Sequence, residues 1–114
     1  MRPRRATIKV KVNERDVLSA CMDILQMKRI FFYRQNSGAL KTESGGFVRF
    51  GTPGAPDIVL IVGGQYVGLE VKSSVGKQSE SQRIFQAGLE EAGGLYWLVS
   101  DPQQLIEKLK TIYP

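Results

Sequence analysis

The sequence contains no histidine and a single cysteine, Cys21, among its 114 residues. Without histidine the chain cannot build a Ser-His-Asp or Cys-His nucleophile, an HExxH zinc site or a Cys/His zinc finger. A lone cysteine excludes an internal disulfide and favours a reducing compartment. Any catalysis must therefore use carboxylates, lysine or arginine, and a hard metal ion suits such groups.

Long hydrophobic runs are also missing. The longest have five or six residues, such as residues 58–62, whereas a membrane span needs about 20. The basic residues 1–5 are followed by a charged segment instead of the apolar stretch of a secretory leader. We therefore expect a soluble, cytoplasmic protein that is neither exported nor bound to a membrane.

Acidic residues are absent from the first part of the chain. Five basic residues precede the first acid, Glu14: Arg2, Arg4, Arg5, Lys9 and Lys11. The whole chain has 16 basic and 11 acidic residues, so the first 11 residues carry its entire net charge of +5. A basic arm (residues 1–11) on a neutral domain (residues 12–114) is typical of a contact with nucleic acid, although such tails also serve solubility alone.

Hydrophobic periodicity predicts alternating helices and strands in the first half of the domain. Asn13 caps a helix over about residues 14–29. The aromatic segments 30–35 and 47–50 are predicted to form two antiparallel strands around a polar loop over 38–46. Residues 57–73 then form a hairpin around a two-residue Gly-Gly turn.

The second half of the domain continues this alternation. Ser79 caps a second helix that ends at Gly93-Gly94, and residues 95–99 form a buried strand. Asp101-Pro102 begins a short terminal helix. One face of the second helix is predicted to consist of Ile84, Phe85, Gly88, Leu89 and Ala92. The order αβββ(β)αβα gives an α/β fold with one mixed central sheet flanked by helices.

The predicted hairpin places two acidic side chains side by side. Its two-residue turn sets Val62 opposite Gln65, and the same register sets Asp57 opposite Glu70. Opposed residues of an antiparallel pair point to the same face, and Lys72 follows Glu70 on that face. Like charges in this position destabilise a sheet, and a shared Mg²⁺ or Mn²⁺ would remove the conflict. A longer turn would shift the register and leave ordinary solvent-facing charges.

A known pattern resembles this arrangement. Pro56-Asp57, twelve intervening residues and Glu70-Val71-Lys72 are similar to the signature of the PD-(D/E)XK nuclease superfamily, whose restriction-endonuclease-like αβββαβ core has the predicted element order. More narrowly, the chain resembles the VRR-NUC (virus-type replication-repair nuclease) family over roughly residues 12–100. That narrower resemblance is carried by Glu14, residues 34–36, 54–57 and 70–72, and Gln82 ahead of Gly93-Gly94.

The resemblance implies a metal-dependent enzyme that hydrolyses DNA phosphodiester bonds. Asp57, Glu70 and the Val71 carbonyl would bind Mg²⁺ or Mn²⁺, and Lys72 would be the catalytic lysine. Glu14 would be a further metal ligand and catalytic carboxylate, although the helix dipole alone also favours an acid in the first turn. No nucleotide cofactor is expected.

Further contacts are expected around this site. Gln82 would join the catalytic residues, or remain an ordinary surface glutamine. Arg34 and Asn36 would bind the DNA backbone, or form a polar strand end. The arm residues Arg2, Arg4 and Arg5 would bind DNA phosphates, which carry no sequence information.

The resemblance also bears on substrate and assembly. Small stand-alone members of the family resemble dimeric Holliday-junction resolvases, and the family occurs in phages and in repair proteins. We therefore expect a homodimer that cleaves branched DNA in a bacterial or phage-infected cell. Its interface would be the apolar face of the strand at 30–33 or of the terminal helix, unless both faces belong to the core. A restriction-like, flap or exonucleolytic nuclease remains an alternative, as does a non-catalytic nucleic-acid-binding module.

Overall fold

The computed structural model describes residues 13–35 and 38–112, with the backbone alone for residues 38–39 and 49–50. The basic arm with Arg2, Arg4 and Arg5, and also Asn36, lie outside the described residues. The described helices and strands are α1 (Glu14–Met27), β1 (Phe31–Arg34), β2 (Gly38–Lys41), β3 (Phe47–Phe50), β4 (Ile58–Val62), β5 (Gln65–Val71), α2 (Glu80–Glu91), β6 (Leu95–Val99) and α3 (Pro102–Lys110).

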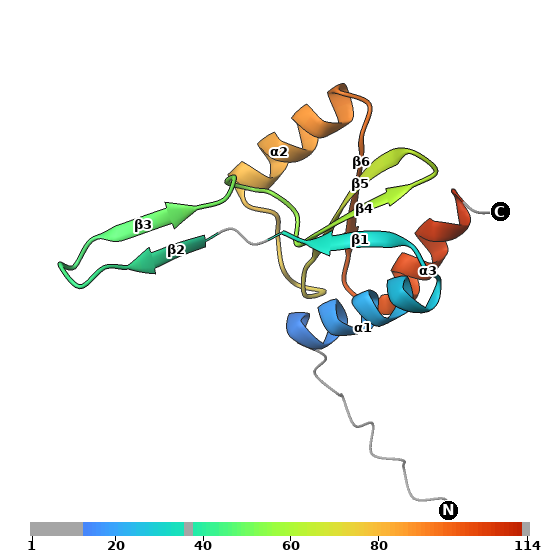
Figure 1. Cartoon of the computed structure of the whole chain (residues 1–114), viewed down its shortest axis with the longest axis horizontal. Coiled ribbons are helices and arrows are strands. Elements are labelled where there is room, and N and C mark those ends of the chain that lie inside the picture. Colours follow the sequence, from blue (N-terminus) through green and yellow to red (C-terminus); the bar gives the residue numbers. More distant parts are fainter. Residues whose placement is uncertain (1–12, 36–37, 113–114) are drawn as a thin grey trace, which may run out of the picture.

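A four-stranded mixed sheet forms the centre of the fold (Figure 1). Its strand order is β1-β4-β5-β6, in which β5 and β6 are parallel and the other pairs are antiparallel. Helices α1 and α3 lie on one side of the sheet and α2 lies on the other. The elements α1-β1-β4-β5-α2-β6 follow the expected αβββαβ order, so the predicted fold class is confirmed.

The strand pairing predicted for residues 30–35 and 47–50 is wrong. Strand β1 pairs with β4, whereas β3 pairs with β2, which lies in the segment predicted as a loop. A tight turn joins β2 to β3: the Thr42 N–H donates to the Gly46 carbonyl at 2.8 Å, and the Gly46 N–H donates to Thr42 Oγ1 at 3.0 Å. Closing so short a loop costs little entropy, which favours this local pairing.

The two short strands form a separate ribbon, which corrects the prediction of a single sheet. The β2–β3 ribbon is inserted between β1 and β4 and projects away from the rest of the chain in Figure 1. In the described part of the chain, the backbones of β2 and β3 lie close to each other and to no other helix or strand.

The predicted hairpin register is confirmed. Val62 lies opposite Gln65 and Ile58 lies opposite Leu69. Gly63 and Gly64 have φ values of 57° and 78°, and two consecutive positive φ values are the requirement of a type I′ turn, whose twist matches that of the strands. The alternative of a longer turn with a shifted register is therefore excluded.

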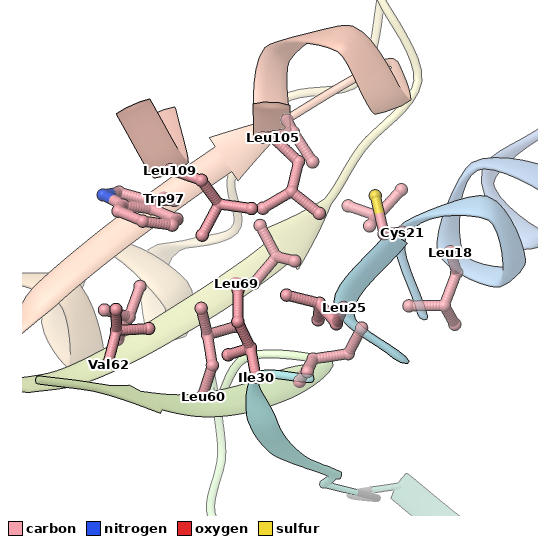
Figure 2. Close-up of a cluster of buried hydrophobic side chains, with 14 of the residues drawn as sticks. Leu18, Cys21, Leu25, Ile30, Leu60, Val62, Leu69, Trp97, Leu105 and Leu109 are labelled. Carbon is pink, nitrogen blue, oxygen red and sulfur yellow. The ribbon is translucent and has the colours of Figure 1, made fainter. Parts of the chain in front are cut away.

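The main core lies between the sheet and the helices α1 and α3 (Figure 2). Leu25 from α1, Leu60 and Leu69 from the sheet, and Leu105 from α3 are completely buried. Burying such a side chain contributes about 1.5–3 kcal/mol. Because Leu105 and Leu109 of α3 belong to this core, its apolar face is not free to serve as a subunit interface.

Helix α1 has the predicted N-terminal cap, Asn13, and ends earlier than predicted. The Asp16 N–H donates to Asn13 Oδ1 at 2.9 Å, and the helix ends at Met27 instead of residue 29. Cys21 lies on its buried face, where burial raises the pKa of the thiol to about 11. The protonated thiol thus behaves as a small apolar side chain in the core.

Helix α2 lies less deeply against the sheet than predicted. Ser79 caps it and Gly93, with φ 94°, follows its end, as expected. Ile84 and Gly88 of the predicted apolar face are exposed, and so is Ala92, which follows the helix. The half-buried face is rotated and consists of Ser81, Gln82, Phe85, Gln86 and Leu89. This face is partly polar because it covers the acidic end of the β4–β5 hairpin.

The remaining elements agree with the sequence in outline. Asp101 caps α3 and Pro102 is its first residue, as predicted. Strand β5 ends at Val71 instead of residue 73. Within residues 13–35 and 38–112, no helix has the length and apolar character needed to cross a membrane.

Candidate active site

The carboxylates of Asp57, just before β4, and Glu70, on β5, each accept a backbone hydrogen bond from the other's strand. The Asp57 N–H donates to Glu70 Oε2 at 3.1 Å, and the Val71 N–H donates to Asp57 Oδ2 at 2.9 Å. Glu70 is only 5% exposed and Asp57 is half-buried. The side-by-side position expected from the hairpin register is therefore present.

The Gly/Pro loop before β4 sets the position of Asp57. Gly54 has φ 79°, and a Cβ on it would overlap the Ser81 carbonyl at the start of α2, so only glycine allows this approach. Farther along, the Gln35 N–H donates to the Asp57 carbonyl at 2.9 Å and ties the loop end to β1. The loop thus lies between β1 and the first turn of α2.

Gln82 links α2 to the carboxylate pair. Its Nε2 donates to Glu70 Oε1 at 2.9 Å, and its Oε1 accepts the Ser79 N–H at 2.9 Å. The Gln82 N–H in turn donates to Ser79 Oγ at 3.2 Å, which completes a capping box. The structure thus brings Gln82 to Glu70, with a side chain that caps its helix and holds a carboxylate oxygen.

Burial makes ionisation of the pair costly. It raises the pKa of Glu70 to about 7, and the neighbouring charge of Asp57 acts in the same direction. Burial also raises the pKa of Asp57, against the opposing effects of the Val71 hydrogen bond and the Lys72 charge. Two adjacent carboxylates that resist ionisation together are stabilised by a cation.

The donor set suits a hard divalent cation. Carboxylate and carbonyl oxygens are the ligands of Mg²⁺ and Mn²⁺, and the pair and the Val71 carbonyl supply both kinds. Within the described residues, Asp57 Oδ1 accepts no hydrogen bond, so this oxygen is the least engaged of the four. The residues present therefore fit a Mg²⁺ or Mn²⁺ site that retains several waters.

Glu14 reaches the same end of the sheet from α1. Its side chain is exposed, its Oε1 accepts the Ser73 N–H at 2.9 Å, and it lines a pocket of about 570 Å³ together with Asp57 and Val71. No group of three Asp, Glu, His or Cys side chains suited to hold one metal ion occurs among the residues described. A direct ligand role for Glu14 stays a prediction.

Arginine side chains line this pocket as well. Arg34, at the end of β1, was expected from the sequence, and its charge is one of those that counter the raised pKa of Asp57. Arg15 was not expected; with Ser19 and Met22 it forms the α1 wall of the pocket. Arg15 lies four residues before Ser19 and seven before Met22, a spacing that places all three on one face of a helix and could have indicated this role.

Lys72 follows the last residue of β5 and lies close enough to the carboxylates for its charge to act on both. It is half-buried, and its positive charge opposes the rise of the pKa of both Asp57 and Glu70. It lines a second pocket of about 260 Å³ with Ser73 and Ser100 among its walls. The predicted residues Glu14, Asp57, Glu70, Lys72 and Gln82 thus converge from α1, the hairpin and α2.

Tyr96 is a neighbour that the sequence did not indicate. It lies on β6 opposite Gly68, and its buried hydroxyl has no hydrogen-bond partner among the described residues. Burial raises its pKa against the opposing effect of the nearby Gln78 side chain, and the charges of Glu70 and Asp57 add to the rise. A tyrosine within an otherwise apolar strand was the available signal.

Comparisons with known proteins agree with this fold. No family model matches the sequence, and no curated protein matches it. A solved structure described as "VRR_NUC domain" matches with a TM-score of 0.63 and 21% sequence identity, over 89% of this chain and 97% of that one. The chain therefore has the fold of a VRR_NUC domain.

Proposed function

We propose that this chain is a VRR-NUC member of the PD-(D/E)XK nucleases and cleaves DNA with the help of Mg²⁺ or Mn²⁺. The observation that carries the proposal is the interlocked pair of Asp57 and Glu70, on the fold of a VRR_NUC domain and with Lys72 close enough to influence both. Neither a structural salt bridge nor a plain cap explains two adjacent, buried acids.

Asp57, Glu70 and the Val71 carbonyl would hold the metal. A bound divalent ion activates water and offsets charge on a phosphodiester. The hydrogen bonds from Val71 and Gln82 leave the carboxylates little rotational freedom, so the oxygens are already placed for a ligand before it arrives. Glu14 would act from the pocket wall through Oε2, which accepts no hydrogen bond from the residues that the structure describes.

Lys72 supplies the positive charge closest to the reacting phosphate. The ammonium group of the half-buried Lys72 can hold a phosphate oxygen and stabilise the negative charge that develops in the transition state. Arg34 and Arg15 would bind phosphates of the strand that enters the pocket beside Asp57. The basic arm would add phosphate contacts farther along the duplex.

Branched DNA is the proposed substrate, and a homodimer the proposed active unit. The contacts expected from Arg34, Arg15 and the arm are to phosphates, so they favour DNA shape over sequence. A four-way junction is two-fold symmetric and needs two incisions. Two copies of one site, related by a two-fold axis, would make them.

Cleavage of labelled DNA tests this function directly. Linear, nicked, flap and four-way substrates are incubated with the protein in Mg²⁺, Mn²⁺, Ca²⁺ or EDTA. Paired incisions in the four-way junction with Mg²⁺ or Mn²⁺, and none in EDTA, are expected. Strong cleavage in excess EDTA would refute the metal site. Preferential cutting of flaps or ends would replace the junction substrate, and binding without any cleavage would leave a non-catalytic module.

A further inference from the structure

A small pocket of about 260 Å³ lies where the parallel strands β5 and β6 end. We call it the serine pocket, because three serines line it. Apart from Lys72, none of its residues has a role in the proposed function. The polar side chains of its wall are those of Lys72, Ser73, Ser74, Ser100 and Gln104.

The wall of the serine pocket offers hydrogen-bond donors and one positive charge. Lys72 supplies the charge, and each serine hydroxyl can donate a hydrogen bond. Among the described residues, no acidic side chain lines the pocket, and the Oγ atoms of Ser73 and Ser74 make no hydrogen bond. The nearby Asp101 accepts the Gln104 N–H at 3.0 Å as the cap of α3. The serine pocket therefore suits an anion.

A glycine leaves room in the wall of the serine pocket. The Gly76 N–H donates to the Ser73 carbonyl at 3.0 Å and closes a tight turn over residues 73–76. Gly76 does not have a positive φ, so the backbone of this turn does not require glycine. A Cβ on Gly76 would lie 3.0 Å from Ser73 Oγ, which is tighter than most real Cβ contacts. The missing side chain therefore leaves space beside the Ser73 hydroxyl.

The size and chemistry of the serine pocket favour a phosphate group over a nucleobase. Pockets that enclose whole small molecules measure about 300–1,000 Å³, and the serine pocket is smaller. Lysine and serine side chains are typical contacts of DNA phosphates. A phosphate oxygen can accept a hydrogen bond from each of these groups, whereas the apolar face of a base would leave them without partners.

The serine pocket adjoins the pocket beside Asp57. Val71 lines the pocket beside Asp57, and the next residue, Lys72, lines the serine pocket. Glu14, on the wall of the first pocket, accepts the N–H of Ser73, on the wall of the second, at 2.9 Å. Consecutive Cα atoms are about 3.8 Å apart, and the phosphates of one DNA strand follow each other every 3.4 Å or so (roughly) along the helix axis. The two pockets are therefore close enough to take successive phosphates of one strand.

We infer that the serine pocket binds the phosphate next to the one that is cleaved, on the same DNA strand. The strand runs from the pocket beside Asp57 into the serine pocket, and Lys72 serves both phosphates. This role rests on the proposed nuclease function and adds to it the course of the strand across the carboxylates. Contacts to a second phosphate fix the orientation of the reacting one, and such orientation lowers the barrier to cleavage.

The test measures binding of a synthetic four-way junction in Ca²⁺, with and without a methylphosphonate at single positions. Ser74→Asp places a negative charge in the serine pocket at an exposed position, so the affinity should fall about tenfold or more. Ser44→Asp, the same change at an exposed serine between β2 and β3, should bind as the wild type does. A methylphosphonate carries no charge. Placed next to the phosphate that is cleaved in Mg²⁺, it should abolish the difference between Ser74→Asp and the wild type.

Equal affinities of Ser74→Asp and the wild type would overturn the inference, and so would an equal loss for Ser44→Asp, which would reflect net charge alone. A Ser74→Asp that binds more weakly with every methylphosphonate, or that couples to a phosphate remote from the cleaved bond, would also overturn it. Absence of DNA binding, or binding without cleavage, would instead refute the proposed function. Circular dichroism checks folding. Ser73→Ala, which keeps the N–H bonded to Glu14, is a second variant and should lose about fivefold in affinity.

Discussion

Raising the pH should destabilise the metal-free protein through Glu70. The pKa of this carboxyl is about 7 in the folded chain, against the ordinary value of 4.5. The folded state therefore holds a proton that the unfolded state releases between about pH 4.5 and 7. The resulting stabilisation is complete below pH 4.5 and is lost as the pH rises through 7. The raised pKa of Asp57 acts in the same direction.

The size of the effect follows from the shift. One pKa unit corresponds to about 1.4 kcal/mol. Without solvent screening, the shift of the Glu70 pKa would therefore contribute roughly 3 kcal/mol to the free energy of unfolding. The pocket beside Asp57 admits solvent, which screens part of this electrostatic contribution. We therefore expect the free energy of unfolding to fall by about 2 kcal/mol between pH 5 and 8.

Urea unfolding in EDTA at pH 5, 6, 7 and 8 measures this loss. Glu70→Gln should remove most of it, because the amide does not titrate. Glu70→Gln also sets an amide against the Asp57 N–H, so its absolute stability is lower and the slope with pH is the informative quantity. Glu43→Gln, at an exposed position, should keep the wild-type slope. Equal slopes for the wild type and Glu70→Gln would refute the reasoning.

Three further predictions concern the loop, the helix cap and the arm. Gly54→Ala should cost more than about 2 kcal/mol of unfolding free energy, because backbone strain at positive φ adds to overlap with Ser81. Gly45→Ala, with φ 90° and open space around it, should cost only the backbone strain of about 1 kcal/mol. Equal losses in urea unfolding would contradict this prediction. Gln82→Ala should cost about 1 kcal/mol of unfolding free energy through the helix cap and should lower the cleavage rate. Gln103→Ala, at an exposed position of α3, should leave the cleavage rate unchanged. A wild-type cleavage rate for Gln82→Ala would remove its role. Deleting residues 1–11 should flatten the slope of log affinity for DNA against log salt concentration, measured in Ca²⁺; an unchanged slope would make the arm a passive tail.

Sequence alone predicted the centre of the site because a short turn determines its geometry. The Gly63-Gly64 turn fixes the β4–β5 register, and that register sets Asp57 beside Glu70. The helix caps at Asn13, Ser79 and Asp101 are equally local, since each depends on residues within one turn. Features specified by neighbours in the chain were therefore predictable.

Features that depend on contacts between residues far apart in the chain could not be predicted from the sequence. The half-buried face of α2 is rotated because Gln82 reaches Glu70, which lies 12 residues away in the chain. Nothing in the helix periodicity signals that contact, and the apolar Ile84 suggested a different face. The ribbon was missed because Gly38–Lys41 has little β propensity by itself and is a strand only through its pairing with Phe47–Phe50.

The cleavage rate of Lys72→Ala tests the central claim most directly. Lys77 is the matched control, because it is an exposed lysine in the same loop between β5 and α2. Single-turnover cleavage of a labelled four-way junction in Mg²⁺ compares Lys72→Ala, Lys77→Ala and the wild type. Lys72→Ala should lose at least about 100-fold in rate, as expected for a group that stabilises transition-state charge, while Lys77→Ala should cleave at the wild-type rate. Cleavage by Lys72→Ala at the wild-type rate would contradict the assignment of this site.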